Sequence, residues 1–327
     1  MQTFESFARD LYPINDGSFE EIALRLFQFQ AINNPVYAKY LTYLGVPTQE
    51  VMSIHDIPFL PITFFKTQDV RSGAWIPEVT FTSSGTTGQE VSRHAVPSLM
   101  FYLAHTQRIF EERFGSLRDF HVLCLLPSYL ERTGSSLVAM ARHFIKESNS
   151  DFSGFYLNNL DKLADQLEKL RGGRKVLLLG VSFALLDLAE DFELDLSHCI
   201  VMETGGMKGR RQELTRVELH DILKKSLNID SVYSEYGMTE LLSQAYSDGN
   251  GKFAPPVSMR VVLREVNDPF AAEKRSLGVI NVIDLANLYS CAFIETQDLG
   301  RIDQNGHFEV LGRLDNSDIR GCNLMVG

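Results

Sequence analysis

The feature that most constrains the fold is an alternation of two kinds of segment between residues 79 and 234. Short apolar runs, typical of buried strands, are separated by longer runs with apolar residues at helical spacing. Strands that alternate with helices are typical of β-α-β units, so we predict an α/β fold with a doubly wound, mostly parallel sheet. The predicted strands are 79–82, 121–126, 175–179, 198–202 and 231–234, and the predicted helices are 99–114, 135–146, 160–171, 185–191 and 210–227.

The two ends of the chain differ from this middle part. The pattern over residues 17–44 predicts two helices, broken at Asn33-Asn34-Pro35 and ended by Gly45-Val46-Pro47. After about residue 251, the segments 257–263, 278–283 and 301–311 predict a small antiparallel β subdomain, the last with a tight Asn305-Gly306 turn. We therefore predict two domains. Residues 1–250 form an α/β body with a helical N-terminal segment, and residues 251–327 form a β-rich closing subdomain with a short tail.

Composition and charge exclude several classes of protein. A net charge of −11 over 327 residues argues against a nucleic-acid partner, which would need a basic surface. The longest apolar run, residues 176–188, is too short to span a membrane, and no secretory signal is visible, so we expect a cytoplasmic protein. The cysteines are scattered without a zinc-ligand spacing, and we expect the first two to be buried thiols. They are Cys124, Cys199, Cys291 and Cys322.

The segment after the first predicted strand carries the strongest functional signal. Residues 79–82 lead into a loop built of serine, threonine and glycine. Glycines let backbone N–H groups turn towards a common point and hydroxyl groups add donors, so the loop suits a polyanion such as a nucleoside triphosphate. It is not a Walker loop, because no Lys-Ser or Lys-Thr follows its second glycine, and an ordinary solvated turn is the alternative. The candidate phosphate-binding residues are Ser84, Gly85, Thr86, Thr87 and Gly88.

Three further motifs follow this loop. They are Tyr236-Gly237-Met238-Thr239-Glu240, Asp298-Leu299-Gly300-Arg301 and Gly312-Arg313. In this order, the four motifs resemble those of adenylate-forming enzymes, the superfamily of acyl-CoA synthetases, luciferases and peptide-synthetase adenylation domains. The resemblance covers roughly residues 60 to 322 and implies the fold of their large N-terminal domain. Those enzymes usually carry a further mobile C-terminal domain with a catalytic lysine, whereas this sequence stops at Gly327, just past the usual hinge.

The resemblance implies that ATP and Mg²⁺ are the cofactors, and it assigns roles within the second motif. Tyr236 would stack on adenine, with Gly237 in the same nucleotide-binding turn. Thr239 would contact the α-phosphate and Glu240 would hold the metal, for which one protein carboxylate is enough. The residues alone leave alternatives open: an ordinary half-buried tyrosine at position 236, and for Glu240 an acid at the N-terminus of a helix.

The resemblance also assigns Asp298 to the ribose hydroxyls and Arg313 to the ribose or the phosphates. The alternative for Asp298 is an acid that caps a turn before Gly300, and the alternative for Arg313 is a solvated arginine. Most relatives have a lysine shortly after the phosphate loop, and here Arg93 is the candidate replacement.

A glycine-rich basic run, residues 203–211, follows the fourth predicted strand. In the superfamily, the corresponding segment lets adenine approach the backbone, which implies nucleotide contacts at Gly205 and Gly206. Lys208 and Arg210 are candidates to replace the missing C-terminal lysine as phosphate partners at a helix N-terminus. The alternative is a basic loop with solvated charges.

Further stretches, residues 58–66, 126–137, 203–211 and 320–322, resemble the acyl-protein synthetase (LuxE-like) family. In that family a fatty acid is adenylated, moved to a cysteine near the C-terminus and passed to a reductase subunit. The resemblance implies a fatty-acid substrate, Cys322 as acyl acceptor, and a reductase or acyl-carrier protein as partner. The acceptor must be a thiolate, and Arg320 is placed to lower the pKa of the thiol. The alternative for Cys322 is a small apolar residue near a chain end.

Three other functions are compatible with the sequence. A CoA ligase of the phenylacetate type would use the same motifs, and a non-catalytic nucleotide-binding subunit would explain the missing lysine. A hydrolase would use Ser182, which follows a predicted strand as in a nucleophile elbow, although Ser182 suits a helix N-cap equally well. Apolar residues that would line an acyl tunnel, or simply form core, are Leu137, Met140, Val181, Phe183 and Met202.

Overall fold

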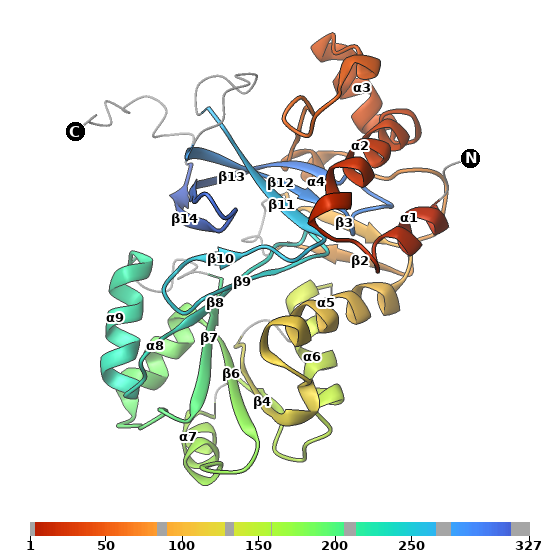
Figure 1. The fold of residues 1–327 in the computed structure, drawn as a ribbon. Helices are drawn as coiled ribbons and strands as arrows, with labels where there is room; N and C mark the ends of the chain where they lie inside the picture. Colours follow the sequence, from red (N-terminus) through yellow and green to blue (C-terminus); the bar gives the residue numbers. More distant parts are fainter. Residues whose placement is uncertain are drawn as a thin grey trace, which may run out of the picture. The chain divides into compact units, whose positions relative to one another are not determined.

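The computed structural model describes residues 4–83, 90–127, 134–157, 159–205, 214–265 and 276–314, which form two compact units (Figure 1). The first unit contains residues 4–77, 90–97, 255–265 and 276–314. The second contains residues 78–83, 98–127, 134–157, 159–205 and 214–254. The N-terminal helices are therefore grouped with the C-terminal strands, which differs from the sequential division at residue 250 that the sequence suggested.

The sheet of the second unit is mostly parallel, and the predicted α/β fold class is confirmed. Its strand order is β10-β9-β8-β7-β6-β4-β5. Strands β5, β4, β6, β7 and β8 are parallel to one another, and β9 and β10 continue the sheet in antiparallel fashion. The strands of this unit are β2 (Val79–Thr82), β4 (Phe120–Leu125), β5 (Gly154–Tyr156), β6 (Lys175–Val181), β7 (Cys199–Thr204), β8 (Tyr233–Tyr236), β9 (Ala245–Ser247) and β10 (Phe253–Ala254).

Helices cover both faces of this sheet. In Figure 1, α5 and α6 lie on one side of strands β4, β6 and β7, and α8 and α9 lie on the other. Local signals fix the helix starts, because Ser98 and Ser135 accept N-cap hydrogen bonds and Thr215 forms a capping box with Glu218. The helices are α5 (Leu99–Phe114), α6 (Ser136–Ser148), α7 (Leu160–Lys169), α8 (Ser182–Asp191) and α9 (Arg216–Leu227), with a 3₁₀ turn at Leu117–Asp119.

The first unit combines N-terminal helices with an antiparallel sheet of order β11-β12-β13-β14, and β1 pairs in parallel with β13. The predicted small antiparallel β region is thereby confirmed. Its helices are α1 (Phe4–Asp10), α2 (Asp16–Asn33), α3 (Pro35–Leu44) and α4 (Phe64–Thr67), with a 3₁₀ turn at Thr48–Glu50. Its strands are β1 (Leu60–Pro61), β3 (Arg93–Val96), β11 (Met259–Arg264), β12 (Leu277–Asp284), β13 (Phe293–Ile302) and β14 (Phe308–Arg313).

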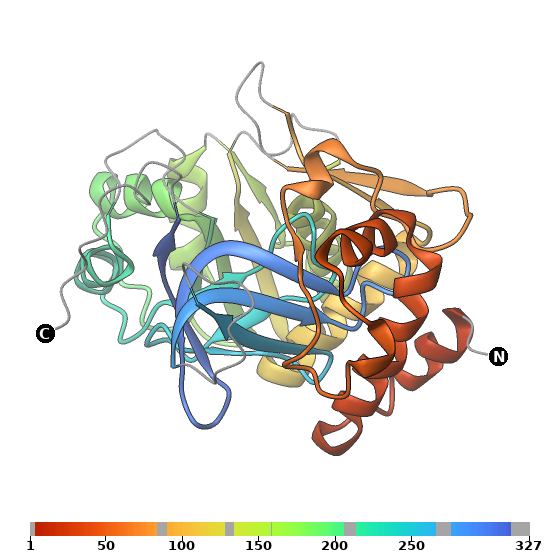
Figure 2. The same cartoon turned by 90° about the horizontal axis from the view of Figure 1, so that it is seen from above.

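Buried amides attach the N-terminal helices to the loop between β12 and β13, residues 285–292. Gln30 donates to the carbonyls of Asn287 and Leu288 at 2.9 and 3.1 Å, and its own carbonyl oxygen accepts from the Ala292 N–H at 2.9 Å. Asn34 donates to the Ser290 carbonyl at 2.9 Å. Figure 2 shows the N-terminal helices, in red, at the end of the blue strands where this loop lies. Since a buried loop must pair its backbone groups, these side chains make the arrangement possible.

Two helix starts differ from prediction for local reasons. Helix α9 begins at Arg216, because Thr215, which forms the capping box, has an extended backbone. Helix α8 begins at Ser182 with Val181 in the N-cap position, so the alternative that Ser182 is an N-cap is wrong. Of the two cysteines expected to be buried, Cys124 is fully buried and Cys199 is half-buried. Within the described residues, no helix is long and apolar enough to cross a membrane.

Candidate nucleotide and acid site

The parallel strands of the second unit bring several predicted residues to one edge. The last residues of β6, β7 and β8 are aligned in register, with Val181 opposite Thr204 and Thr204 opposite Glu235. Gly205, which follows β7, therefore lies beside Tyr236 at the end of β8. Gly205 has φ +73°, a conformation that favours glycine. Ligands of open parallel sheets bind at the carboxyl ends of the strands, which is where the structure brings these two residues together.

The ring of Tyr236 is buried, with 8% of the residue exposed. It packs against Phe253 of β10, with ring centroids 5.8 Å apart and planes inclined by 60°. The Arg216 guanidinium lies 4.9 Å from the centroid of the same phenylalanine ring. Phe253 and Arg216 therefore support the tyrosine from one direction, and adenine stacking by Tyr236 stays a prediction.

Thr239 and Glu240 lie in a turn closed by a hydrogen bond from the Leu241 N–H to the Met238 carbonyl at 3.1 Å. No helix begins there, so the alternative that Glu240 is the acid of a helix N-terminus is wrong. Glu240 is buried, with 5% exposed. Across the described parts of the chain, no group of three or more His, Cys, Asp or Glu side chains is placed to hold a metal. A metal held at Glu240 would therefore take its remaining ligands from the nucleotide and water, as Mg²⁺ usually does with ATP.

Gly237 is required by close packing. A Cβ atom at this position would lie 2.2 Å from Glu235 Oε1, and no larger residue fits without moving that carboxylate. Glycine at position 237 therefore leaves room for the Glu235 carboxylate beside the turn that carries Thr239.

A buried network surrounds Glu203, the residue before Thr204 in β7. The Ser182 hydroxyl donates to Glu203 Oε2 at 3.0 Å and is also within 3.2 Å of the Gly205 carbonyl oxygen. Arg216 and His220 of α9 lie 3.6 and 3.8 Å from Glu203 Oε1. Burial opposes ionisation of Glu203, but the hydrogen bond from His220 and the charge of Arg216 outweigh it and hold its pKa below the ordinary value.

This geometry does not suit a hydrolase. Ser182 is buried, and its partners, a carboxylate and a carbonyl, accept its proton in hydrogen bonds. The neighbouring imidazole of His220 lies near Glu203 and the Ser234 hydroxyl instead. A serine nucleophile needs a base strong enough to take its proton, and the Glu203 carboxylate that accepts from Ser182 has a pKa held below the ordinary value, so it is a weak base. Its contacts position the Gly205 backbone.

Glu235 is a candidate site residue that sequence reasoning missed. The Thr204 hydroxyl donates to Glu235 Oε2 at 2.5 Å. Burial raises the pKa of Glu235 to about 7; the Thr204 hydrogen bond opposes this rise, and the Glu203 carboxylate adds to it. A strongly perturbed carboxyl at a strand end is typical of a functional site. The available signal was an acidic residue next to the predicted strand 231–234 and directly before the Tyr-Gly motif.

Asp298 and Arg313 meet in the first unit. They are directly opposite each other on the antiparallel strands β13 and β14. Asp298 lies within a strand, and its N–H donates to the Thr296 hydroxyl at 3.1 Å, so the alternative of a turn-capping aspartate is wrong. The residue is half-buried and Arg313 is exposed. Cross-strand neighbours of opposite charge can act together on one ligand, and their role at a ribose stays a prediction.

Several predicted residues lie outside the described part of the chain, and their roles stay predictions. They are Ser84, Gly85, Thr86, Thr87, Gly88, Gly206, Lys208, Arg210, Arg320 and Cys322.

Arg93, the candidate replacement for the lysine after the phosphate loop, is exposed at the start of β3. Of the predicted acyl-tunnel residues, Met140, Val181, Phe183 and Met202 are buried core residues.

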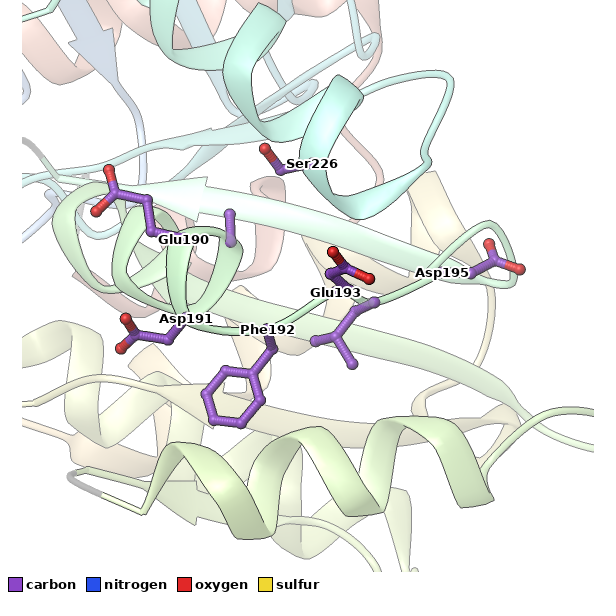
Figure 3. A pocket seen from close by; sticks show the side chains of 8 residues that line it. Glu190, Asp191, Phe192, Glu193, Asp195 and Ser226 are labelled. Atoms are coloured by element: carbon purple, nitrogen blue, oxygen red, sulfur yellow. The ribbon is translucent and has the colours of Figure 1, made fainter.

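A hollow of about 620 Å³ in the second unit is lined by residues 189–195 and Ser226 (Figure 3). Four of its lining residues are acidic: Glu190, Asp191, Glu193 and Asp195. Negative charge there would repel a nucleotide polyphosphate. The lining segment also precedes β7, so it lies at the amino end of that strand, whereas the predicted residues lie at its carboxyl end. This hollow is therefore not the nucleotide site.

Solved structures with the same fold are known, although no protein-family description and no curated protein sequence matches the chain. One is 2-hydroxyisobutyryl-CoA ligase in the postadenylation state in complex with R3-HIB-AMP, with a TM-score of 0.65 and 12% identity over 94% of this chain and 70% of that chain. The fold is that of the large domain of adenylate-forming enzymes.

Two further structures agree with this result. An ATP-bound RpMatB-BxBclM chimera has a TM-score of 0.52 and 17% identity, and ATP-bound MatB from Rhodopseudomonas palustris has a TM-score of 0.50 and 18% identity. Each match covers 72% of this chain and 47% of the other, so the chain spans about half the length of these proteins. A shared fold does not by itself fix an activity.

Proposed function

We propose that the chain uses ATP to activate a carboxylic acid and then transfers the acyl group to a thiol. In the first step, a carboxylate oxygen bonds to the α-phosphorus of ATP while the bond from that phosphorus to the bridging oxygen breaks. Acyl-adenylate forms and pyrophosphate leaves. The observation that carries the proposal is the placement of Gly205 and the Tyr236–Glu240 motif side by side at adjoining strand ends of this fold.

In this proposal each motif has one role. Tyr236 and the glycine backbone at 205 and 206 bind adenine, and Asp298 with Arg313 binds the ribose. Loop residues 84–88 and Lys208 bind phosphates, Thr239 contacts the α-phosphate, and Glu240 holds Mg²⁺. Positive charge and a divalent metal are needed because a carboxylate must approach a polyphosphate of like charge.

The acyl acceptor and the acid are the less constrained parts of the proposal. The resemblance to acyl-protein synthetases supports a fatty acid, Cys322 as acceptor, and a reductase or acyl-carrier partner. CoA is the second candidate acceptor, and it is favoured by a specific observation: the 2-hydroxyisobutyryl enzyme of the same fold is a CoA ligase captured with an acyl-adenylate.

The test is exchange of radiolabelled pyrophosphate into ATP with purified protein, Mg²⁺ and a panel of fatty, hydroxy, amino and aromatic acids. Acid-dependent exchange supports the proposal. ATP binding without exchange for any acid contradicts it and supports a non-catalytic nucleotide-binding subunit.

The acceptor is tested with the acid that gives the fastest exchange. Mass spectrometry after incubation with ATP should detect acylation at Cys322, and Cys322→Ser should abolish it while leaving exchange intact. Acyl-CoA formation without a protein adduct would instead establish CoA as the acceptor. Cys291→Ser serves as the control thiol, since Cys291 is fully buried.

A further inference from the structure

The hairpin formed by β8 and β9 separates two chemically different faces. Tyr236 is opposite Ala245, and its ring packs on Phe253. Glu235 is opposite Tyr246, so these two side chains lie on the other face. Gln244 precedes Tyr246 by two residues and shares its face. We call Glu235, Gln244 and Tyr246 the polar triad.

Two buried atoms of the polar triad have no hydrogen-bond partner among the residues that the structure describes. Among the described residues, Gln244 Oε1 and Tyr246 OH are buried and have no hydrogen-bond partner, although only 3% and 2% of these residues are exposed. The Gln244 amide nitrogen is engaged, donating to the Leu242 carbonyl at 3.2 Å. Buried polar atoms in native proteins are nearly always paired, so two such atoms on one face point to a missing partner.

Glu235 adds a hydrogen-bond acceptor to the face of the hairpin that carries Gln244 and Tyr246. The Thr204 hydroxyl donates to Glu235 Oε2, and the other carboxylate oxygen, Oε1, lies towards Gly237. A Cβ built on Gly237 would lie 2.2 Å from Glu235 Oε1 and 3.4 Å from Gln244 Cγ, so both side chains approach the same glycine. Glu235 is also half-buried rather than fully enclosed, so a ligand can reach it.

The surroundings show that the triad is not part of a solvated surface. Tyr246 packs against Phe110 and Phe114 of α5, with ring centroids 5.9 and 5.4 Å apart. Burial and the nearby Glu235 and Tyr102 groups raise the pKa of Tyr246 well above its ordinary value, so its hydroxyl keeps its proton. The neighbouring Tyr102 hydroxyl, by contrast, donates to the Ser136 carbonyl at 3.0 Å and is satisfied by the fold.

The hydrogen-bonding capacity of the three side chains indicates which kind of ligand they would bind. Gln244 Oε1 and the ionised form of Glu235 only accept hydrogen bonds, while the Tyr246 hydroxyl can accept or donate, and a bound cation favours that ionised form. A primary ammonium supplies three donors and a charge opposite to that of a carboxylate, and an alkyl chain supplies neither. We propose that the polar triad binds an amino group on the acid, and that the substrate is an amino-substituted carboxylic acid instead of a plain fatty acid. This inference rests on the proposed function, because it names the acid that the same site activates.

The test compares acids that differ only in the amino group, by pyrophosphate exchange. Pairs of equal carbon number are alanine and propionate, 4-aminobutyrate and butyrate, and 6-aminohexanoate and hexanoate. We expect one amino acid to exceed its partner in kcat/KM by about 100-fold or more, since sites built to hydrogen-bond a substrate group strongly reject analogues that lack it. Glu235→Gln should reduce that preference at least tenfold, and Tyr246→Phe should reduce it by a smaller factor.

Tyr102→Phe is the matched control. It removes a neighbouring tyrosine hydroxyl that the fold already uses, so it should lower the melting temperature and leave the preference unchanged. Tyr246→Phe should leave the melting temperature unchanged and reduce the preference for the amino acid.

The outcomes separate this inference from the proposed function. Exchange with plain acids that equals or exceeds exchange with their amino partners overturns the amino-group assignment and leaves acid activation standing. An amino preference that survives both Glu235→Gln and Tyr246→Phe also overturns it, because Tyr246 is then a core tyrosine only. No exchange with any acid overturns the proposed function and this inference with it.

Discussion

The loop between β12 and β13 and the β8–β9 hairpin both bury polar groups, but they treat them differently. In the loop, Gln30 and Asn34 use their amides to pair carbonyl and N–H groups. In the hairpin, Glu235, Gln244 and Tyr246 keep atoms that the described residues do not satisfy. A buried network that is fully paired stabilises a fold, whereas one that is left open at a strand end is typical of ligand binding.

This difference separates positions that affect stability from positions that affect chemistry. Substitutions in the loop should lower the free energy of unfolding and leave the activity of the remaining folded protein unchanged. Substitutions at the ends of β7 and β8 should lower the activity without lowering the free energy of unfolding.

The largest expected effect is on activity at Glu240. Glu240→Gln keeps the size of the side chain and removes the charge predicted to hold Mg²⁺. We expect pyrophosphate exchange to fall by about 100- to 1000-fold, as is usual when a major electrostatic contribution is lost. Circular dichroism should confirm a native fold. Exchange within threefold of the wild type would contradict the metal role.

The next effect is on stability at Gln30. Gln30→Ala removes three hydrogen bonds and leaves buried backbone groups unpaired, so the free energy of unfolding should fall by about 2–4 kcal/mol, measured by urea denaturation. Gln28→Ala on the same helix removes one bond, to the Thr48 carbonyl, and is the control for a smaller loss. A loss for Gln30→Ala no larger than for Gln28→Ala would contradict the stabilising role.

The pKa of Glu235 predicts a pH-dependent stability. Its value of about 7 in the folded protein exceeds the ordinary 4.5, so the folded state holds the proton more tightly than the unfolded state. The contribution of this carboxyl therefore favours folding below pH 4.5 and is lost as pH rises through 7. Glu235→Gln should match the wild type near pH 4 and be more stable at pH 8, by on the order of 2–3 kcal/mol. Equal stability at both pH values would be inconsistent with the raised pKa.

The smallest effect is expected at the acidic hollow. Arg171→Ala removes an exposed ion pair with Asp195, whose pKa is lowered mainly by hydrogen bonds from Ser197, with Arg171 and Asn228 contributing. Exposed pairs contribute little, so the melting temperature should stay within about 2 °C of the wild type and exchange should not change. A large loss of exchange would identify the hollow as part of the site.

Where the sequence carries complete local signals, it predicts the structure well. The helix Leu99–Phe114 and the strand Val79–Thr82 are found at their predicted limits. The first has an N-cap at Ser98 and ends at Gly115, which has φ +94°. Such signals act within a few residues, so they can be identified from the chain alone.

Where the conformation of a segment depends on the strands that pair with it, the local sequence does not predict it. Asp298-Leu299-Gly300 looks like a turn, yet β12 and β14 hold it extended, with a register shift between Leu299 and Gly300. A Cβ at Gly300 would lie 2.6 Å from Ile280 and 2.7 Å from the Glu309 carbonyl, so packing between strands requires this glycine. The sequence does not show which strands will be its neighbours.

The candidate site likewise contains residues whose proximity the sequence predicted and one residue that it did not predict. The neighbourhood of Gly205 and Tyr236 follows from consecutive β-α-β units, which place their strand ends together. Glu235 was missed, because its raised pKa depends on burial and on the Thr204 and Glu203 side chains of β7, and the surroundings of Tyr246 beside it depend on α5.

The contact between Gly237 and Glu235 has a consequence for how such a protein can diversify. Since a side chain at position 237 would have to move the Glu235 carboxylate, a substitution there would disturb both the proposed amino-group site and the peptide that leads to Thr239. New specificities should therefore arise first at Gln244 and Tyr246, where a replacement leaves the backbone of the Tyr-Gly motif undisturbed. A directed-evolution experiment that randomises these two positions samples new substrates while preserving the turn that carries Thr239 and Glu240.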